Sequence, residues 1–144
     1  MATFRVGRRF AFEKFRIYTD GRGSKYYTVF VFADKHAMYV FRDEWHEAWG
    51  VKKSYRFEAE CVSWKWKSLE DKRMHKRDIG CVIFHLGFIG SGVVSHEMTH
   101  AALFWRRKRH SDERVCRVQG ELVRQFWLKY YRANLHRRAR LLNA

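Results

Sequence analysis

Short runs of alternating or continuous apolar residues fill the first half of the chain and predict strands. Residues 14–20 alternate apolar and polar side chains, and residues 26–32 form a run of aromatic and β-branched residues. A glycine-rich turn signal at residues 20–23 separates the two runs. Residues 55–67 alternate with a period of two, and residues 78–85 form an apolar run typical of a buried strand. The region up to residue 85 is therefore expected to be mainly strands.

The second half of the chain has the apolar spacing of helices. It predicts a helix over residues 91–107, with Ser91 as its N-cap, and a long helix over residues 112–134. Earlier in the chain, residues 38–41 fit a short third strand and residues 43–49 fit a short helix ended by a glycine. Because the strands come first and the helices follow, the fold class is expected to be α+β, with a small, mostly antiparallel N-terminal sheet.

Nothing in the sequence divides the chain into parts. It has no proline, no repeat and no low-complexity tract, and its 144 residues fit a single domain over residues 1–144. The last ten residues, 135–144, are expected to form a basic tail after the long helix. Hydrophobic residues make up 47% and aromatic residues 17% of the chain, which is enough for a core and excludes an intrinsically disordered protein.

Other classes are excluded because their signatures are missing. No uncharged apolar stretch approaches about 18 residues, so no membrane span is expected. The first 15 residues lack the apolar segment of a secretory signal, so a cytoplasmic location is expected. Cys61, Cys81 and Cys116 are odd in number and too far apart for a CxxC metal clip, so they are interpreted as reduced thiols.

The charge is strongly basic and unevenly distributed. Thirty Lys and Arg against 15 Asp and Glu give a formal net charge of +15, and residues 101–144 hold 12 basic against 3 acidic side chains. The densest clusters are residues 106–109 and 137–140. This charge fits nucleic acid as a partner, and it equally fits a solvated basic helix face. A Trp-Lys-Trp-Lys run at residues 64–67 fits either a base-stacking platform or an ordinary strand with one buried face.

Residues 96–100 read HEMTH, which is an HExxH motif on the predicted helix. Residues four apart lie one turn apart on the same helix face, so His96 and His100 can bind one metal ion. Glu97 lies on the adjacent face, where its carboxylate can take a proton from a zinc-bound water. The motif follows a buried strand and a glycine loop and is flanked by small or apolar residues. The alternative is two histidines with ordinary hydrogen-bond partners.

The stretch GVVSHEMTHAALFW, followed by a turn and DERVCRVQGELVRQFW, resembles the compact zincin metallopeptidases. In particular it is similar to small, gluzincin-like proteins of phage or prophage type, over about residues 78–127. The resemblance implies a peptidase with one Zn²⁺ per chain, held by His96, His100 and a downstream acidic residue, in the cytoplasm of a bacterial host. It also implies that the strand before the motif helix is an edge strand that aligns an extended peptide. In this chain that strand contains Gly80, Cys81, Val82 and Ile83.

The third zinc ligand is open. By the same resemblance it is Glu113, which lies where the gluzincins have an acidic residue at the start of the next helix. An ordinary helix start, with Ser111 as N-cap and acidic residues in the first turn, explains Glu113 equally well. The other candidates are Glu121, His110, Cys116 and Asp112.

The leading hypothesis is a zinc metallopeptidase, a hydrolase of protein or peptide substrates, in which Glu97 is the general base. An oxyanion stabiliser is also expected. One alternative is a basic nucleic-acid-binding protein with a structural metal. Another is a catalytically idle zincin scaffold that binds a partner protein. The residues able to stabilise an oxyanion are His75, His85, Tyr130 and Tyr131.

Overall fold

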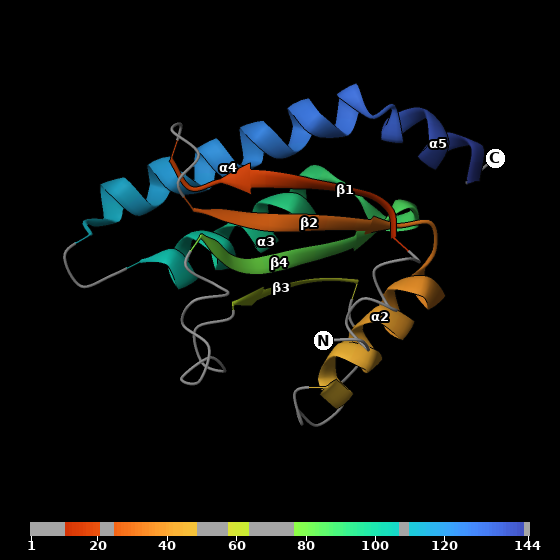
Figure 1. Cartoon of the computed structure of the whole chain (residues 1–144). Coiled ribbons are helices and arrows are strands. Elements are labelled where there is room, and N and C mark those ends of the chain that lie inside the picture. Colours follow the sequence, from red (N-terminus) through yellow and green to blue (C-terminus); the bar gives the residue numbers. More distant parts are fainter. Residues whose placement is uncertain (1–10, 21–24, 49–57, 64–76, 107–109, 143–144) are drawn as a thin grey trace.

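A four-stranded sheet forms the centre of the molecule (Figure 1). The structure is a computed structural model and describes residues 11–20, 25–48, 58–63, 77–106 and 110–142. The strands are β1 (Ala11–Tyr18), β2 (Tyr26–Phe32), β3 (Ala59–Ser63) and β4 (Asp78–His85), in the spatial order β1-β2-β4-β3. β2 and β4 pair in parallel, whereas β1 with β2 and β3 with β4 pair antiparallel. The α+β class is therefore confirmed, with a mixed sheet.

The two central strands are buried on both faces, which explains their nearly continuous apolar sequences. Along β2, Val29 and Val31 belong to one core cluster, whereas Phe30 and Phe32 belong to a second cluster on the other face. β1 lies at one edge, and of its two faces only the one that carries Ile17 packs into the larger cluster. The predicted alternation of this strand follows from that one-sided burial.

Helices cover both faces of the sheet (Figure 1). α2 (Lys35–Ala48) packs through Met38 and Phe41 on the face that carries Phe30. The opposite face is covered by α3, α4 and α5. The short 3-10 turn η2 connects β4 to α3. Their bounds are Leu86–Phe88 for η2, Ser91–Trp105 for α3, Asp112–Arg132 for α4 and Leu135–Leu142 for α5. The prediction of Ser91 as N-cap is wrong by one residue, because Gly90 is the N-cap of α3.

Local signals set the ends of the last helices. Ser111 is the N-cap of α4, and its hydroxyl accepts a hydrogen bond from the Arg114 amide at 3.3 Å, as predicted. At the other end, Asn134 has a φ of 56°, a left-handed conformation that asparagine tolerates better than most residues. This residue turns the chain from α4 into α5. Residues 135–142, predicted as part of a basic tail, are thus a helix.

Two sequence predictions for the segment before β3 need correction. Residues 38–41, predicted as a strand, lie inside α2, because Met38 and Phe41 are three residues apart and both face the sheet. The helix predicted over residues 43–49 begins instead at Lys35. The short apolar run at residues 38–41 is compatible with the period of a strand and with that of a helix. Packing of this segment against the sheet favours the helix.

The predicted edge strand is an inner strand. β4, which contains Gly80–Ile83, pairs with β2 on one side and with β3 on the other. The edge position next to α3 belongs to β3, which occupies the centre of the strand predicted over residues 55–67. The tryptophan-lysine run at residues 64–67 lies outside the described residues. Among the described helices, none is long and apolar enough to cross a membrane.

Candidate active site

α3 places the HExxH motif at the boundary between core and solvent. Its buried face carries Val94, Met98 and Ala101, which pack into the larger core cluster. The phenol of Tyr27 on β2 donates a buried hydrogen bond of 2.7 Å to the Ala101 carbonyl, which ties the helix to the sheet. Burial raises the pKa of Tyr27, so this phenol stays protonated and remains a donor.

The two motif histidines come together on the outer side of α3. The Nε2 atoms of His96 and His100 lie 3.2 Å apart, and the ring centroids are separated by 4.8 Å in an edge-to-face arrangement. His96 is largely exposed, with 68% of its side-chain surface open to solvent. Burial, and then the neighbouring His96, lower the pKa of His100, which favours the neutral imidazole that binds metals.

The histidine geometry fits two ligands of one zinc ion. Two nitrogens that bind a tetrahedral zinc at about 2.0–2.1 Å lie about 3.3–3.4 Å from each other. The observed separation of the His96 and His100 nitrogens is within about 0.2 Å of that value. Within the described ranges, however, no group of three His, Cys, Asp or Glu side chains is placed to hold a metal. The described residues thus bring together two candidate ligands, fewer than the three that a catalytic zinc requires, and the same 3.2 Å contact is a hydrogen bond between the two rings.

Glu97 lies beside this pair but faces inward. Its side chain is almost fully buried, with a carboxylate oxygen 3.9 Å from the His96 Nε2. Burial raises the pKa of Glu97 to about 7, with a smaller contribution from Glu60. A hydrogen bond from the Cys61 backbone amide acts in the opposite direction. The carboxylate is therefore held in place by a strand that lies across the cleft from its own helix.

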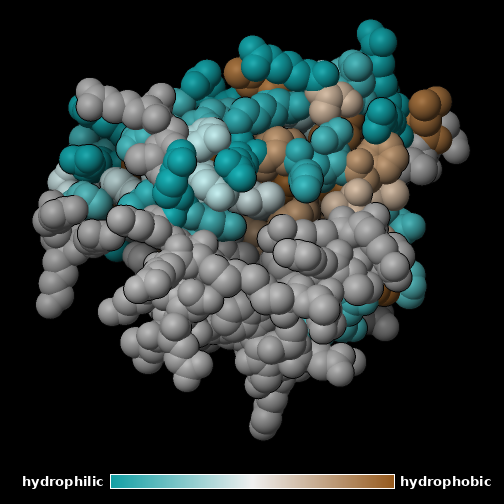
Figure 2. Space-filling model, in the orientation of Figure 1, coloured by the Kyte–Doolittle hydropathy of each residue, from teal (hydrophilic) through white to brown (hydrophobic). Residues whose placement is uncertain are grey.

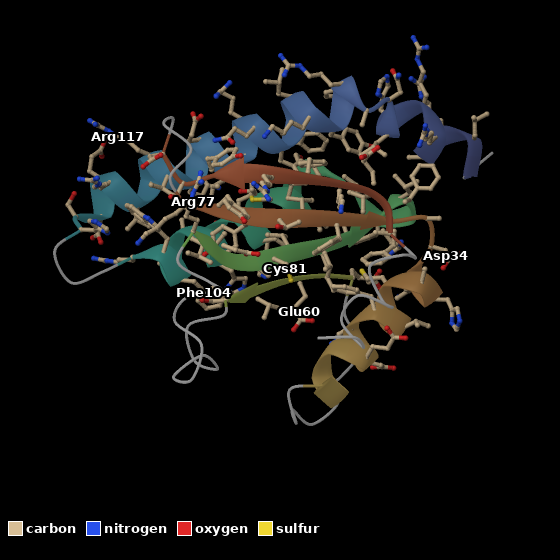
Figure 3. The ribbon with its side chains drawn as sticks, in the orientation of Figure 1. Asp34, Glu60, Arg77, Cys81, Phe104 and Arg117 are labelled. Atoms are coloured by element: carbon tan, nitrogen blue, oxygen red, sulfur yellow. The ribbon has the colours of Figure 1, made fainter. Side chains whose placement is uncertain are left out.

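A cleft of about 530 Å³ opens over these three residues. One wall is α3, the opposite wall is β3, and α2 contributes Arg42. β3 is hydrogen-bonded to β4 on one side, and no described strand pairs with its other side. In Figure 3 the Glu60 side chain extends from β3, and Phe104 lies near one end of that strand. The cleft is lined by Arg42, Glu58, Ala59, Glu60, Cys61, Gly92, Val93, His96, Glu97, His100 and Phe104.

The charged side chains around the cleft form ion pairs. Arg42 is buried, and its Nε lies 3.1 Å from a carboxylate oxygen of Glu60. Burial nevertheless raises the pKa of Glu60. The Glu58 Oε1 atom accepts a hydrogen bond of 2.5 Å from Lys35 Nζ, and its Oε2 atom lies 3.2 Å from the Nε2 of His85. Those two contacts, the lysine first, lower the pKa of Glu58.

Glu113 lies away from the histidine pair. Its exposed carboxylate is 3.6 Å from Arg117 Nε. It lines a separate hollow of about 680 Å³ that also includes Trp105 and Glu121 and shares no described residue with the cleft. Glu121 in turn accepts from Arg124 at 2.6 Å. The structure therefore does not bring either glutamate to the two imidazoles.

The other candidates are also dispersed. The His110 ring stacks on Trp105 with the centroids 4.2 Å apart, and Asp112 pairs with Arg106 at 2.7 Å. Cys116 is exposed on α4. Of the four proposed oxyanion stabilisers, His85 is buried against Glu58, whereas Tyr130 and Tyr131 line a different hollow near α5, and His75 lies outside the described residues.

Sequence reasoning missed Arg42, Glu58 and Glu60 as part of the site. Glu58 directly precedes β3 and Glu60 lies within it. The pairing of β3 depends on distant residues in β4. Arg42 lies between the strand predicted over residues 38–41 and the helix predicted over residues 43–49, whereas the structure places it inside α2. No spacing motif links these three to residues 96–100. For Glu58 and Glu60, the sequence signal is the presence of charged residues inside the strand predicted over residues 55–67.

Comparison of the chain with family models, with curated proteins and with solved structures finds no match.

Proposed function

We propose that this protein is a zinc-dependent hydrolase of peptide bonds, with the reaction centred on the HExxH segment of α3. The observation that carries the proposal is the 3.2 Å separation of the His96 and His100 nitrogens directly beside the buried carboxylate of Glu97. Two exposed imidazoles one helical turn apart form a donor set suited to zinc. The neighbouring carboxylate, which is shielded from solvent, is a base suited to hydrolysis.

The residues of the chain have distinct parts in this reaction. His96 and His100 would hold the metal through Nε2. Zinc, when bound, polarises a substrate carbonyl and makes water a nucleophile near neutral pH. Glu97 accepts the proton released on attack and passes it to the leaving amine, which restores the carboxylate. The Cys61 amide holds Glu97 in this position.

The edge of β3 with which no described strand pairs supports a peptide as substrate. An extended chain that pairs with an exposed strand edge is fixed by backbone hydrogen bonds, whatever its side chains. β3 lines the same cleft as the histidines and Glu97. A peptide paired with Ala59–Cys61 would therefore lie in the same cleft as His96 and His100. The alignment role that the sequence assigned to Gly80–Ile83 is thus proposed for β3.

The test is the zinc content of the purified full-length chain, measured by mass spectrometry of the metal. About one zinc per chain is expected, and His100→Ala is expected to lose it because one nitrogen remains to bind the ion. Thr99→Ala is the matched control on the same helix, since the Thr99 hydroxyl donates to the Ser95 carbonyl within α3. A metal-free wild-type chain after exposure to zinc would overturn the proposal.

The third ligand is tested in the same series. Glu113 faces a hollow that is separate from the cleft, so Glu113→Ala is expected to keep its zinc. Loss of zinc from this variant, with retention in Glu121→Ala, would instead identify Glu113 as the ligand and show that the first turn of α4 reorients when the metal binds.

A further inference from the structure

The corner where α4 meets α5 combines a concentration of arginines with an aromatic hollow. From Leu122 to Leu142 the chain contains six Lys or Arg residues and no Asp or Glu. Figure 3 shows nitrogen-tipped side chains projecting outward from α4 and α5, away from the sheet. The surface along the top of Figure 2 is largely hydrophilic, with hydrophobic atoms at its right-hand end.

Four arginines of this corner are not neutralised by described residues. No carboxylate in the part of the chain that the structure describes forms an ion pair with Arg132, Arg137, Arg138 or Arg140, and all four are exposed. By contrast, Arg117 at the start of α4 pairs with a glutamate. Among the arginines of α4 and α5, most of those without a described carboxylate partner therefore lie at the α5 end.

The fold fixes the position of these cations. The left-handed Asn134 sets the direction of α5 relative to α4, and its carbonyl accepts from the Arg137 and Arg138 amides. The Arg138 guanidinium lies 4.5 Å from the ring centroid of Phe12 on β1, which holds it without removing its charge. Arginine also suits phosphate better than lysine does, because its planar fork donates two parallel hydrogen bonds.

A hollow of about 560 Å³ adjoins the arginines. Its walls include Tyr131, His136 and Arg140, together with the backbone around Gly87. Tyr131 is 54% exposed, and its ring lies 4.9 Å from that of His136. An exposed aromatic ring beside cations is the arrangement on which single-stranded nucleic acids stack a base while their phosphates are neutralised.

We propose that the α4–α5 corner binds single-stranded nucleic acid, with phosphates on Arg132, Arg137 and Arg140 and an unpaired base stacked on Tyr131. The exposed ring of Tyr131 favours a single strand over a duplex, because the bases of a duplex are already stacked on one another and are not free to stack on the ring. The corner shares no described residue with the cleft, so this binding is independent of the proposed hydrolase activity.

The binding test uses a fluorescein-labelled 15-residue oligo-dT and fluorescence anisotropy on the full-length chain. With three arginine–phosphate contacts, the affinity is expected to fall about 20-fold between about 50 mM and about 200 mM salt. No binding at the lower salt concentration would overturn the proposal. So would binding of vesicles of phosphatidylserine and phosphatidylcholine with no binding of the oligonucleotide.

Paired variants locate the contact. Arg137→Gln/Arg140→Gln is expected to weaken binding and to reduce the salt slope by about 1.4, whereas the matched double variant Arg114→Gln/Arg117→Gln changes the slope little. Equal losses in the two variants would show only general electrostatic attraction and would overturn the assignment to this corner. Thermal melts of both variants check that each is folded.

The aromatic part has its own test. Tyr131→Ala is expected to weaken oligo-dT binding about fivefold or more, and Tyr131→Phe to restore it, because phenylalanine keeps the stacking face. A labelled duplex of the same length is expected to be insensitive to Tyr131→Ala. Wild-type affinity of Tyr131→Ala for oligo-dT would overturn the stacking site.

Discussion

The cleft beside α3 and the corner between α4 and α5 use charge in opposite ways. Around the cleft, the cations Arg42 and Lys35 are each paired with a glutamate at short distance. At the corner, exposed arginines face solvent without a described carboxylate partner. Paired charges hold side chains in a fixed geometry, whereas unpaired charges produce a field that extends over about a Debye length. The first arrangement suits chemistry on a bound substrate, and the second suits capture of a polyanion.

The largest expected effect is a loss of peptide hydrolysis at the cleft without a loss of nucleic-acid binding at the α4–α5 corner. Glu97→Gln is expected to lower peptide hydrolysis about 10²- to 10⁴-fold because the proton acceptor is lost. Cleavage of a quenched fluorogenic peptide library measures the loss, alongside zinc content and oligo-dT affinity, which are both expected to stay at wild-type values. Arg137→Gln/Arg140→Gln is the reciprocal control and should hydrolyse peptides normally. Unchanged hydrolysis in Glu97→Gln would remove this residue, and the cleft, from the reaction.

A smaller effect concerns the stability that the paired charges provide. Arg42→Leu leaves the half-buried carboxylate of Glu60 without its partner, and we expect the free energy of unfolding to fall by about 1–3 kcal/mol. Arg124→Leu removes an exposed pair with Glu121 and is expected to destabilise the fold much less, because solvent screens that pair. Urea denaturation compares the two variants. Similar costs would mean that the buried pair is no more important than the surface pair.

The smallest expected effect is a pH dependence. Lys35 and His85 lower the pKa of Glu58 below its ordinary value of 4.5, so the ionised carboxylate stabilises the fold at neutral pH. That contribution is present above the unfolded-state pKa and is lost as the pH falls through the lowered folded-state pKa. Glu58→Gln should therefore be slightly less stable than the wild type at pH 7. Thermal melts at a series of pH values should show the two proteins converging in acid, and a constant difference would contradict this origin.

The features that sequence predicted well are those set by nearby residues. The apolar runs of β2 and β4, the period of α4 and the Ser111 cap depend on neighbours within a few positions. The one-turn spacing of His96 and His100 likewise follows from helix geometry alone. A short stretch of sequence is therefore sufficient to predict each of these features.

The features that sequence did not predict depend on pairing between distant segments. Whether β4 is an edge strand is decided by where β3 docks, and five residues of β3 do not encode that choice. Arg42 reaches the cleft because α2 packs against the sheet through Met38 and Phe41. The direction in which Glu113 points is also set by the rotation of α4 about its axis, which follows from burial of Val115 and Val118.

The parallel pairing of β2 and β4 has a consequence for how the molecule assembles. Parallel neighbours cannot be joined by a tight turn, and here the connection between them contains both α2 and β3. Closing such a long connection costs chain entropy and slows folding compared with contacts between adjacent helices. β3 and Arg42, which form one side of the cleft, both belong to this connection, whereas α3 and α4 are neighbours in the chain. We therefore expect the helical hairpin to form early during refolding and the complete cleft to appear only in the slowest phase.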